Sequence, residues 1–415
     1  MDTVLYNKER LLALMDRFHL DGVVAATPEN ILYLSGFSSW SQNAYRYGGS
    51  QVYVVFPRDQ ARSPALLIGG GDVGYTALDD VWLKEVYTYG RARKHNVPDT
   101  AKLTAEEKRA VSVTESAPMG RTPEEALARL IKEKGMDRSQ LGMDHSGISF
   151  TTFEMLKSHL PQAKLHPASS FFRYVRMIKT PVEIARLKEA ATVNEQAIKA
   201  MLTCAKPGVT EGELAGIYKS EVARAGGQVY WMHMSAGRGG NFPAIKNRVL
   251  QQGDIFRVDM GCSVQGYHAD TCKSGCVGQP SEAHRKKYEA VRTGVLKAIE
   301  RLKPGALPSE LYETMVQGVR AAGLPNYSNF FVGHTIGLEA REFPFLLGPA
   351  EEINDPFLPK STDIPIESGT VVNLEASSHE LGWGSVQVEY TLVVTDKGHE
   401  HLIPPEQKLY SLPLH

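Results

Sequence analysis

Two stretches near the middle of the chain alternate between apolar and polar residues, as short β-strands do. Residues 254–262 and 267–271 flank the segment 263–266, in which Gly266 can adopt a positive φ. We expect a hairpin folded about Val264–Gln265, which would set Asp259 opposite Asp270. Like charges that face each other across a ladder are destabilising, and buried carboxylates are costly unless they are paired or bind a metal. The pattern therefore predicts a cation such as Mn, Mg, Fe or Zn between the two aspartates, and the alternative is two solvent-facing aspartates beside a turn.

The first third of the chain has the pattern of an α/β domain, in which helical and strand-like periods alternate. An amphipathic helix is predicted over residues 7–20, and strands are predicted over 22–26, 51–56 and 65–68. Residues 92–122 are polar and poorly periodic, which indicates an insertion, a lid or a mobile loop. Helix resumes where Thr122 offers an N-cap and Pro123 occupies the first helical position.

The second part of the chain begins with a clear helix start. Thr180 is the predicted N-cap, Pro181 the first helical residue and Glu183 the partner of a capping box. Further helices are predicted from Thr210 and over about 282–302 and 308–322, and from residue 229 onward the pattern is rich in strands. We expect two domains, residues 1–168 and 169–415.

Composition limits the classes of function. The chain has 415 residues and a net charge of −1, which gives no electrostatic basis for binding nucleic acid or an anionic membrane. It contains no run of about 18 apolar residues and no signal-like N-terminus, so a cytoplasmic protein without a membrane span is expected. Its four cysteines do not form a disulfide framework. Three of them flank the predicted hairpin, where packing thiols are favoured over a zinc–thiolate site.

Three more polar residues stand in apolar, strand-like surroundings. His334 lies in the segment Gly333-His334-Thr335, Glu375 ends the apolar run 371–374, and Glu389 is in the middle of the run 386–394. Glutamate is disfavoured at the centre of a valine-rich strand. Several carboxylates and a histidine in such places indicate a polar site rather than isolated structural groups.

The order of Asp259, Asp270, His334, Glu375 and Glu389 resembles that of the M24 metallopeptidases. This family includes Xaa-Pro dipeptidase, aminopeptidase P and methionine aminopeptidase, and creatinase shares its pita-bread fold. The resemblance extends over nearly the whole chain, including residues 10–37 and 176–184. It implies an α/β creatinase-like N-terminal domain over residues 1–168, followed by an α+β pita-bread catalytic domain over residues 169–415.

The resemblance also implies a set of roles. Asp259 would bind one divalent ion, Asp270 and Glu389 would bridge two ions, and His334 and Glu375 would bind the other. Mn, Fe, Co and Zn are the candidates, and Glu375 would be the general base toward a shared water. A small-molecule or short-peptide substrate and a homodimer are further implications.

The sequence departs from the family where substrate is handled. Phe242 and Arg341 stand where the peptidases carry histidines, and His233 could substitute for one of them. Arg341 and Arg238 would add positive charge near the metals, and arginine pairs well with carboxylates. We therefore expect a substrate with a free carboxylate. Candidate contacts from the N-terminal domain are the aromatic and basic residues of one loop, Trp40, Tyr45 and Arg46.

The sequence thus predicts a binuclear-metal hydrolase of amide-type C–N bonds with an altered Xaa-Pro peptidase pocket. One alternative is a non-peptidase pita-bread enzyme that hydrolyses or eliminates from a small amino-acid derivative, as creatinase and ectoine hydrolase act on theirs. A second alternative is a catalytically inactive pita-bread module used for binding. The presence of all five predicted ligands argues against that second alternative.

Overall fold

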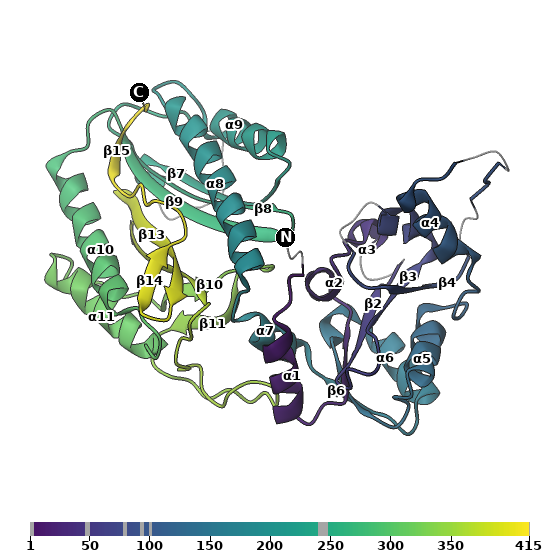
Figure 1. Cartoon of the computed structure of the whole chain (residues 1–415). Helices are drawn as coiled ribbons and strands as arrows, with labels where there is room; N and C mark the ends of the chain where they lie inside the picture. Colours follow the sequence, from purple (N-terminus) through teal and green to yellow (C-terminus); the bar gives the residue numbers. More distant parts are fainter. Residues whose placement is uncertain are drawn as a thin grey trace. The chain divides into compact units, whose positions relative to one another are not determined.

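The chain folds into two compact units, Met1–Arg176 and Met177–His415, in the computed structural model shown in Figure 1. The structure describes residues 4–45, 50–77, 81–91, 95–98, 102–239 and 248–414. The sequence placed the division after residue 168, whereas the helix that follows this point lies in the first unit. No helix among the described residues has the length and apolar character needed to cross a membrane.

The first unit is built on one six-stranded sheet in the order β4-β3-β2-β1-β5-β6. The strands β1–β2 and β2–β3 pair antiparallel, and the other neighbours pair parallel. Its strands are β1 (Gly22–Ala25), β2 (Tyr53–Pro57), β3 (Ala65–Gly69), β4 (Glu85–Tyr89), β5 (Gln140–Met143) and β6 (Lys164–Pro167). Its helices are α1 (Lys8–Arg17), α2 (Pro28–Ser35), α3 (Trp40–Tyr45), α4 (Ala105–Glu115), α5 (Pro123–Glu133), α6 (Phe150–His159) and α7 (Ser169–Arg176), with the 3-10 helices η2 (Gly70–Ala77) and η3 (His145–Gly147).

The region 92–122 contains a regular helix over residues 105–115, so the mobile-loop alternative is wrong for those residues. Its prediction as an insertion or a lid stays a prediction. Helix α4 starts at a capping box in which Thr104 and Glu107 exchange side-chain to backbone hydrogen bonds. The helix buries only Ala110, Val113 and Thr114, so its apolar period is weak. The Thr-x-x-Glu signature was the available sequence signal.

The second unit contains two sheets, in the orders β11-β10-β12-β13-β14 and β15-β9-β8-β7. Its strands are β7 (Gln228–Ala236), β8 (Ile255–Val264), β9 (Tyr267–Val277), β10 (Phe331–Thr335), β11 (Glu342–Leu347), β12 (Val371–Glu380), β13 (Gly384–Thr395), β14 (Gly398–His401) and β15 (Leu409–Leu412). Its helices are α8 (Pro181–Thr203), α9 (Glu211–Arg224), α10 (Glu282–Arg301) and α11 (Pro308–Ala321), with the 3-10 helix η4 (Gly237–Gly239).

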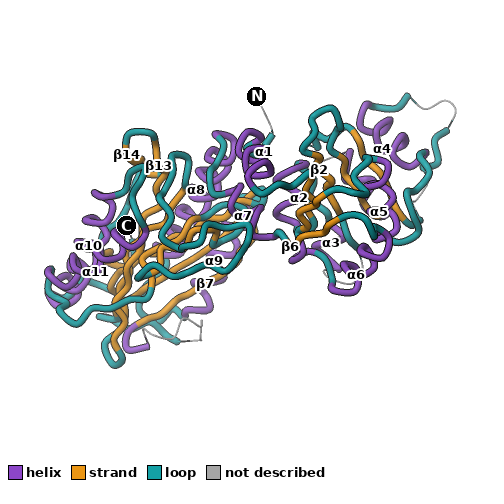
Figure 2. The backbone as a smooth tube through the Cα atoms, turned by 90° about the horizontal axis from the view of Figure 1, so that it is seen from below, coloured by secondary structure: helices purple, strands orange, loops and turns teal. Residues whose placement is uncertain are grey.

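Helices cover both sides of this double sheet. Helix α8 packs on β8 and β9, helix α9 packs on β7, and α10 with α11 packs on the strands of the other sheet. In Figure 2 the strands of the second unit (orange) gather in one layer with helices (purple) around them. A continuous apolar core joins α10 and α11 to β12 and β13, with Val291, Leu311, Val372 and Val388 among its buried residues.

The predicted hairpin is present, but its register differs from the prediction. Gln265 and Gly266 both have positive φ, at 50° and 84°, and form a two-residue turn between Val264 and Tyr267. Asp270 therefore faces Gly261, and Asp259 faces Cys272, so the prediction that the two aspartates lie directly opposite is wrong. The turn is centred one residue later than expected, which moves the pairing by two. Both aspartates keep the same face because side-chain direction repeats every two residues.

Candidate metal centre

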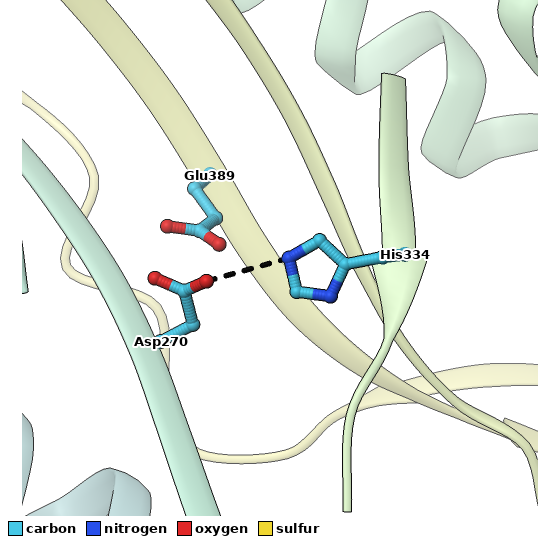
Figure 3. A group of neighbouring side chains, drawn as sticks. All are labelled: Asp270, His334 and Glu389. Carbon is cyan, nitrogen blue, oxygen red and sulfur yellow. Dashed lines mark ion pairs between the residues drawn. The ribbon is translucent and has the colours of Figure 1, made fainter. Parts of the chain in front are cut away.

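Buried acids and a histidine converge from both sheets of the second unit. Asp270 on β9, His334 on β10 and Glu389 on β13 each offer a ligand atom, and these atoms lie within 4.8 Å of one another. Figure 3 shows the three side chains pointing toward a common point. All three are buried, as is Glu375 on β12. The structure thus brings together residues that are far apart in the chain, and their role as metal ligands stays a prediction.

The ring of His334 points its unprotonated nitrogen, Nε2, toward the acids. Its Nδ1 lies 3.1 Å from the carbonyl oxygen of Thr335, which can only accept, so Nδ1 carries the hydrogen. Its Nε2 lies 3.3 Å from Asp270 Oδ2 and 3.7 Å from Glu375 Oε1. Burial lowers the pKa of His334. A neutral ring then presents a lone pair to carboxylate oxygens, which is an arrangement that a bound cation would stabilise.

Asp270 and Glu389 are short of hydrogen-bond donors. Within the described part of the chain, Asp270 Oδ1, Glu389 Oε2 and His334 Nε2 have no hydrogen-bond partner. Burial and the neighbouring carboxylates raise the pKa of Asp270 and of Glu389 well above their usual values. Buried polar atoms are normally satisfied, so unpartnered atoms on three neighbouring side chains suit a metal ion. The donor set of carboxylates and imidazole suits Mn, Fe, Co or Zn.

The acids that lie directly opposite each other are Glu375 and Glu389, on the antiparallel pair β12–β13. Asn373 Nδ2 donates to Glu389 Oε1 at 2.8 Å, and Gln387 Nε2 donates to Glu375 Oε2 at 2.8 Å. Burial raises the pKa of Glu375. Two acids therefore do face each other across a ladder, as was expected for Asp259 and Asp270, but they are Glu375 and Glu389. Facing like charges are destabilising.

Asp259 has a different environment from the other acids. Arg257 Nη2 lies 3.1 Å from its Oδ2, Gln387 Nε2 donates to the same oxygen at 3.2 Å, and Trp231 Nε1 donates to Oδ1 at 3.0 Å. Burial alone would raise the pKa of Asp259, but the charge of Arg257 and these donors outweigh burial, and the pKa is lowered. Asp259 is therefore a stabilised anion before any metal is considered.

The sequence interpretation missed the residues that surround the acids. Arg257, Asn373 and Gln387 each stand two positions before an acid on the same strand, so they share its face. A polar residue two positions before an acid in an apolar strand could therefore have been recognised from the sequence as a neighbour of that acid. Trp231 could not be found this way because it comes from β7. Its indole lies over Gly261, where an added Cβ would be 2.2 Å from the ring.

Two substrate candidates of the second unit lie near the acids. Arg341 is exposed, with its guanidinium 5.5 Å from the centre of the Phe331 ring, and its charge offsets part of the burial and carboxylate effects on the pKa of Asp270. His233 Nδ1 lies 4.0 Å from Asp259 Oδ2. Arg238 is exposed on η4, and its guanidinium lies beside Gly382 at the turn between β12 and β13. Its proximity to the metals therefore stays a prediction.

The aromatic candidates Trp40 and Tyr45 are exposed on α3 of the first unit and contact each other edge to face, with ring centres 5.6 Å apart. Trp40 also stacks on Tyr75. Their role as substrate contacts stays a prediction. Phe242 and Arg46 lie outside the described residues.

Comparison with known proteins identifies both parts of the chain. Residues 8–178 match the creatinase/prolidase N-terminal domain, and residues 185–396 match metallopeptidase family M24. The chain is 23% identical over 412 residues to the uncharacterized peptidase YqhT of Bacillus subtilis, covering 97% of this chain and 99% of that protein. It is 25% identical over 298 residues to the Xaa-Pro dipeptidase of Lactobacillus helveticus, covering 70% and 78% respectively.

Solved structures share the fold over the whole length. The Xaa-Pro dipeptidase from Bacillus anthracis superimposes with a TM-score of 0.75 at 22% identity, covering 97% of this chain and 98% of that one. The X-Pro aminopeptidase from Thermotoga maritima gives a TM-score of 0.74 at 18% identity, covering 96% and 100%. The expected creatinase-like domain followed by a pita-bread domain is confirmed. The chain belongs to metallopeptidase family M24 and is a metal-dependent hydrolase.

Proposed function

We propose that the chain hydrolyses an amide-type C–N bond in a short peptide or small amino-acid derivative, in the manner of the Xaa-Pro peptidases. The observation that carries the proposal is the meeting of Asp270, His334 and Glu389 at one buried point with unpartnered ligand atoms. Relatives named Xaa-Pro dipeptidase support the peptide-like substrate class.

Asp270, His334, Glu375 and Glu389 would hold a divalent ion. When bound, such an ion would lower the pKa of a water molecule and polarise the scissile carbonyl. The family resemblance implies a second ion at Asp259. Glu375 would accept the proton at Oε1, which faces His334, because Gln387 Nε2 already occupies Oε2. The raised pKa of Glu375, caused by burial, suits a base that must later release that proton.

The test is hydrolysis by purified full-length protein supplied with Mn, Fe, Co or Zn. Candidate substrates are Xaa-Pro dipeptides, other dipeptides and N-acylated amino acids. Loss of the base in Glu375→Gln should lower kcat by about 10²- to 10⁴-fold. Glu380→Gln, at the exposed end of the same strand, is the matched control and should retain activity. Equal losses in both variants would remove Glu375 from the proposed role.

We infer that the substrate carries a free carboxylate that pairs with Arg341. This residue is exposed, and its charge acts on the buried acids. A substrate acid should be preferred over its amide by about tenfold or more, as expected for a charged hydrogen bond. Arg341→Gln should abolish that preference, whereas Arg301→Gln, at an exposed position in the last turn of α10, should retain it. No preference for the acid in the wild-type protein would contradict the inference.

The position of Arg341 also favours a second candidate, a non-peptidase enzyme of the same fold acting on a small amino-acid derivative. Activity on N-acylated or cyclic amino acids without activity on dipeptides would select it. Absence of both bound metal and activity would select the inactive binding module. A homodimer is also part of the proposal, and light scattering of the purified protein tests it.

A further inference from the structure

Asp259 already has a positive charge beside it, which is the guanidinium of Arg257. Arg257 lies two residues earlier on β8, on the same face of the strand, with Nη2 at 3.1 Å from Asp259 Oδ2. The Arg257 side chain is only 8% exposed and that of Asp259 only 15%. An arginine side chain carries a fixed positive charge, so it offsets the negative charge of the neighbouring carboxylate.

The guanidinium is held in place from the other sheet. Arg257 Nε donates to Gln387 Oε1 at 2.6 Å, and because Nε can only donate, this contact fixes the orientation of the Gln387 amide. Gln387 Nε2 then donates to both Asp259 Oδ2 and Glu375 Oε2, at 3.2 and 2.8 Å. The arrangement is a built network rather than a chance surface pair.

The second oxygen of Asp259 is also occupied. Trp231 Nε1 donates to Oδ1 at 3.0 Å, and only a residue without a Cβ at position 261 leaves room for its indole ring. Strands β7, β8 and β13 therefore each supply a donor to Asp259. These three donors leave Asp259 little acceptor capacity for a divalent ion. Such an ion would also lie beside a fixed positive charge, which would repel it.

The other acids of the centre have the opposite environment. Asp270 Oδ1, Glu389 Oε2 and His334 Nε2 meet no donor among the residues that the structure describes, and all three side chains are more than nine-tenths buried. A cation at this point would satisfy all three atoms without displacing a protein donor. The predicted two-metal site thus has two unequal halves. Asp259 already has protein donors and a positive charge, whereas Asp270, His334 and Glu389 still need a cation.

We propose that each chain binds one divalent ion tightly, at Asp270, His334 and Glu389, and that the Arg257 guanidinium takes the place of a second ion at Asp259. This rests on the metal-dependent part of the proposed function and replaces its second metal with a protein charge. The neighbouring Glu375 completes the ion's environment, while Gln387 links that environment to Arg257.

The test measures metal content in the absence of substrate, so it does not depend on catalysis. Full-length protein is stripped with a chelator and dialysed against graded Mn²⁺, and bound metal is counted. We expect one ion per chain, with any second ion binding at least about 100-fold more weakly because of the charge of Arg257. Electron paramagnetic resonance should give the spectrum of an isolated Mn²⁺ rather than that of two coupled ions.

Variants separate the two halves of the centre. Asp259→Asn should retain the ion, whereas Asp270→Asn should bind it more than about 100-fold more weakly. Such a loss of affinity would exceed the loss expected when a residue that only hydrogen-bonds to a ligand is removed. Arg257→Met, which keeps an unbranched apolar stem without the charge, should bind a second ion. Arg257→Lys, which keeps the charge, should still bind one and serves as the control if the methionine variant folds poorly.

The outcomes distinguish this inference from the proposed function. Two ions of similar affinity in the wild-type protein, or loss of the ion in Asp259→Asn, would overturn the inference and leave a binuclear hydrolase. No bound ion in the wild-type protein would overturn both. One ion that survives Asp259→Asn supports the inference, whichever substrate is cleaved.

Discussion

Two buried aspartates, one in each unit, show how the same residue type is used in different ways. Asp144 follows β5 in the first unit and is fully buried. Its Oδ2 accepts from Ala26 N, Thr27 N, Thr27 Oγ1 and Asn30 Nδ2 at 2.8–3.1 Å, and its Oδ1 accepts from Ser169 Oγ at 2.8 Å. Both oxygens accept from protein donors, so Asp144 is a structural group that joins the connection between β1 and α2 to α2 and α7.

Asp270 is buried to a similar extent, but its surroundings are acidic. Its near neighbours include His334 Nε2 at 3.3 Å, and its Oδ1 has no donor within the described ranges. Buried charge is costly unless protein donors or a cation compensate it. The comparison teaches that the supply of donors, rather than burial, separates a structural carboxylate from a metal ligand. The predictions that follow test that distinction.

The largest effect is expected for Asp270→Asn. Removing a proposed ligand should reduce hydrolysis by about 10³-fold or more, since a bound ion would activate the water and polarise the scissile carbonyl. The free energy of unfolding of the metal-free protein should stay the same or increase, because asparagine replaces a carboxyl group whose ionisation is disfavoured by burial and by the neighbouring carboxylates. Steady-state kinetics and denaturant unfolding measure the two effects. A large loss of metal-free stability would show that Asp270 has structural donors after all.

Asp144→Ala should show the opposite behaviour. The change leaves buried donors of Ala26, Thr27 and Asn30 without an acceptor, which should cost about 3 kcal/mol or more in free energy of unfolding. The number of bound Mn²⁺ ions per folded chain should not change. Denaturant unfolding and metal analysis check both statements, and loss of bound metal from folded Asp144→Ala protein would contradict the separation of roles.

Glu183 is an intermediate case, with some donors but strong burial. Burial raises its pKa from 4.5 to about 7, although Lys179, the Thr180 N–H and the Tyr267 hydroxyl lower it and Glu342 raises it. The folded chain therefore keeps a proton that the unfolded chain releases, and the free energy of unfolding should fall by about 3 kcal/mol as the pH rises from 4.5 to 7.

Glu183→Gln should remove that fall, because the side chain no longer titrates. Denaturant unfolding of metal-free wild-type and variant protein at several pH values measures the difference. Glu189→Gln, at an exposed position of the same helix, is the control for a glutamine substitution in α8. An unchanged pH slope in Glu183→Gln would mean that another group carries the effect.

The smallest effect is expected for Trp231→Phe, which removes one of the donors to Asp259. The loss should be about 1 kcal/mol in free energy of unfolding, the usual value of one hydrogen bond, since Arg257 and Gln387 remain. Metal content should not change. A second bound ion in Trp231→Phe would show that the indole, rather than Arg257, excludes metal from Asp259.

Much of the fold could be predicted because its signals are local. The helix starts predicted at Thr180 and Thr210 are the N-caps of α8 and α9. Helix α4 was missed because its apolar stripe is short, and the register of β8 and β9 was misjudged because it depends on the φ values of Gln265 and Gly266. Which residues share a strand face was nevertheless right, since a shift of two in register preserves it.

By itself, the sequence determined which residues could be ligands. Alternation along β9, β12 and β13 places Asp270, Glu375 and Glu389 on inward faces, and this parity is set by the chain covalently. Only the tertiary structure decided which acids lack donors. Trp231 and Gln387 reach Asp259 from other strands, and only folding reveals that Asp270 and Glu389 retain unpartnered oxygens. Hydrogen bonds between segments distant in sequence depend on the packing of two sheets, for which no local pattern exists.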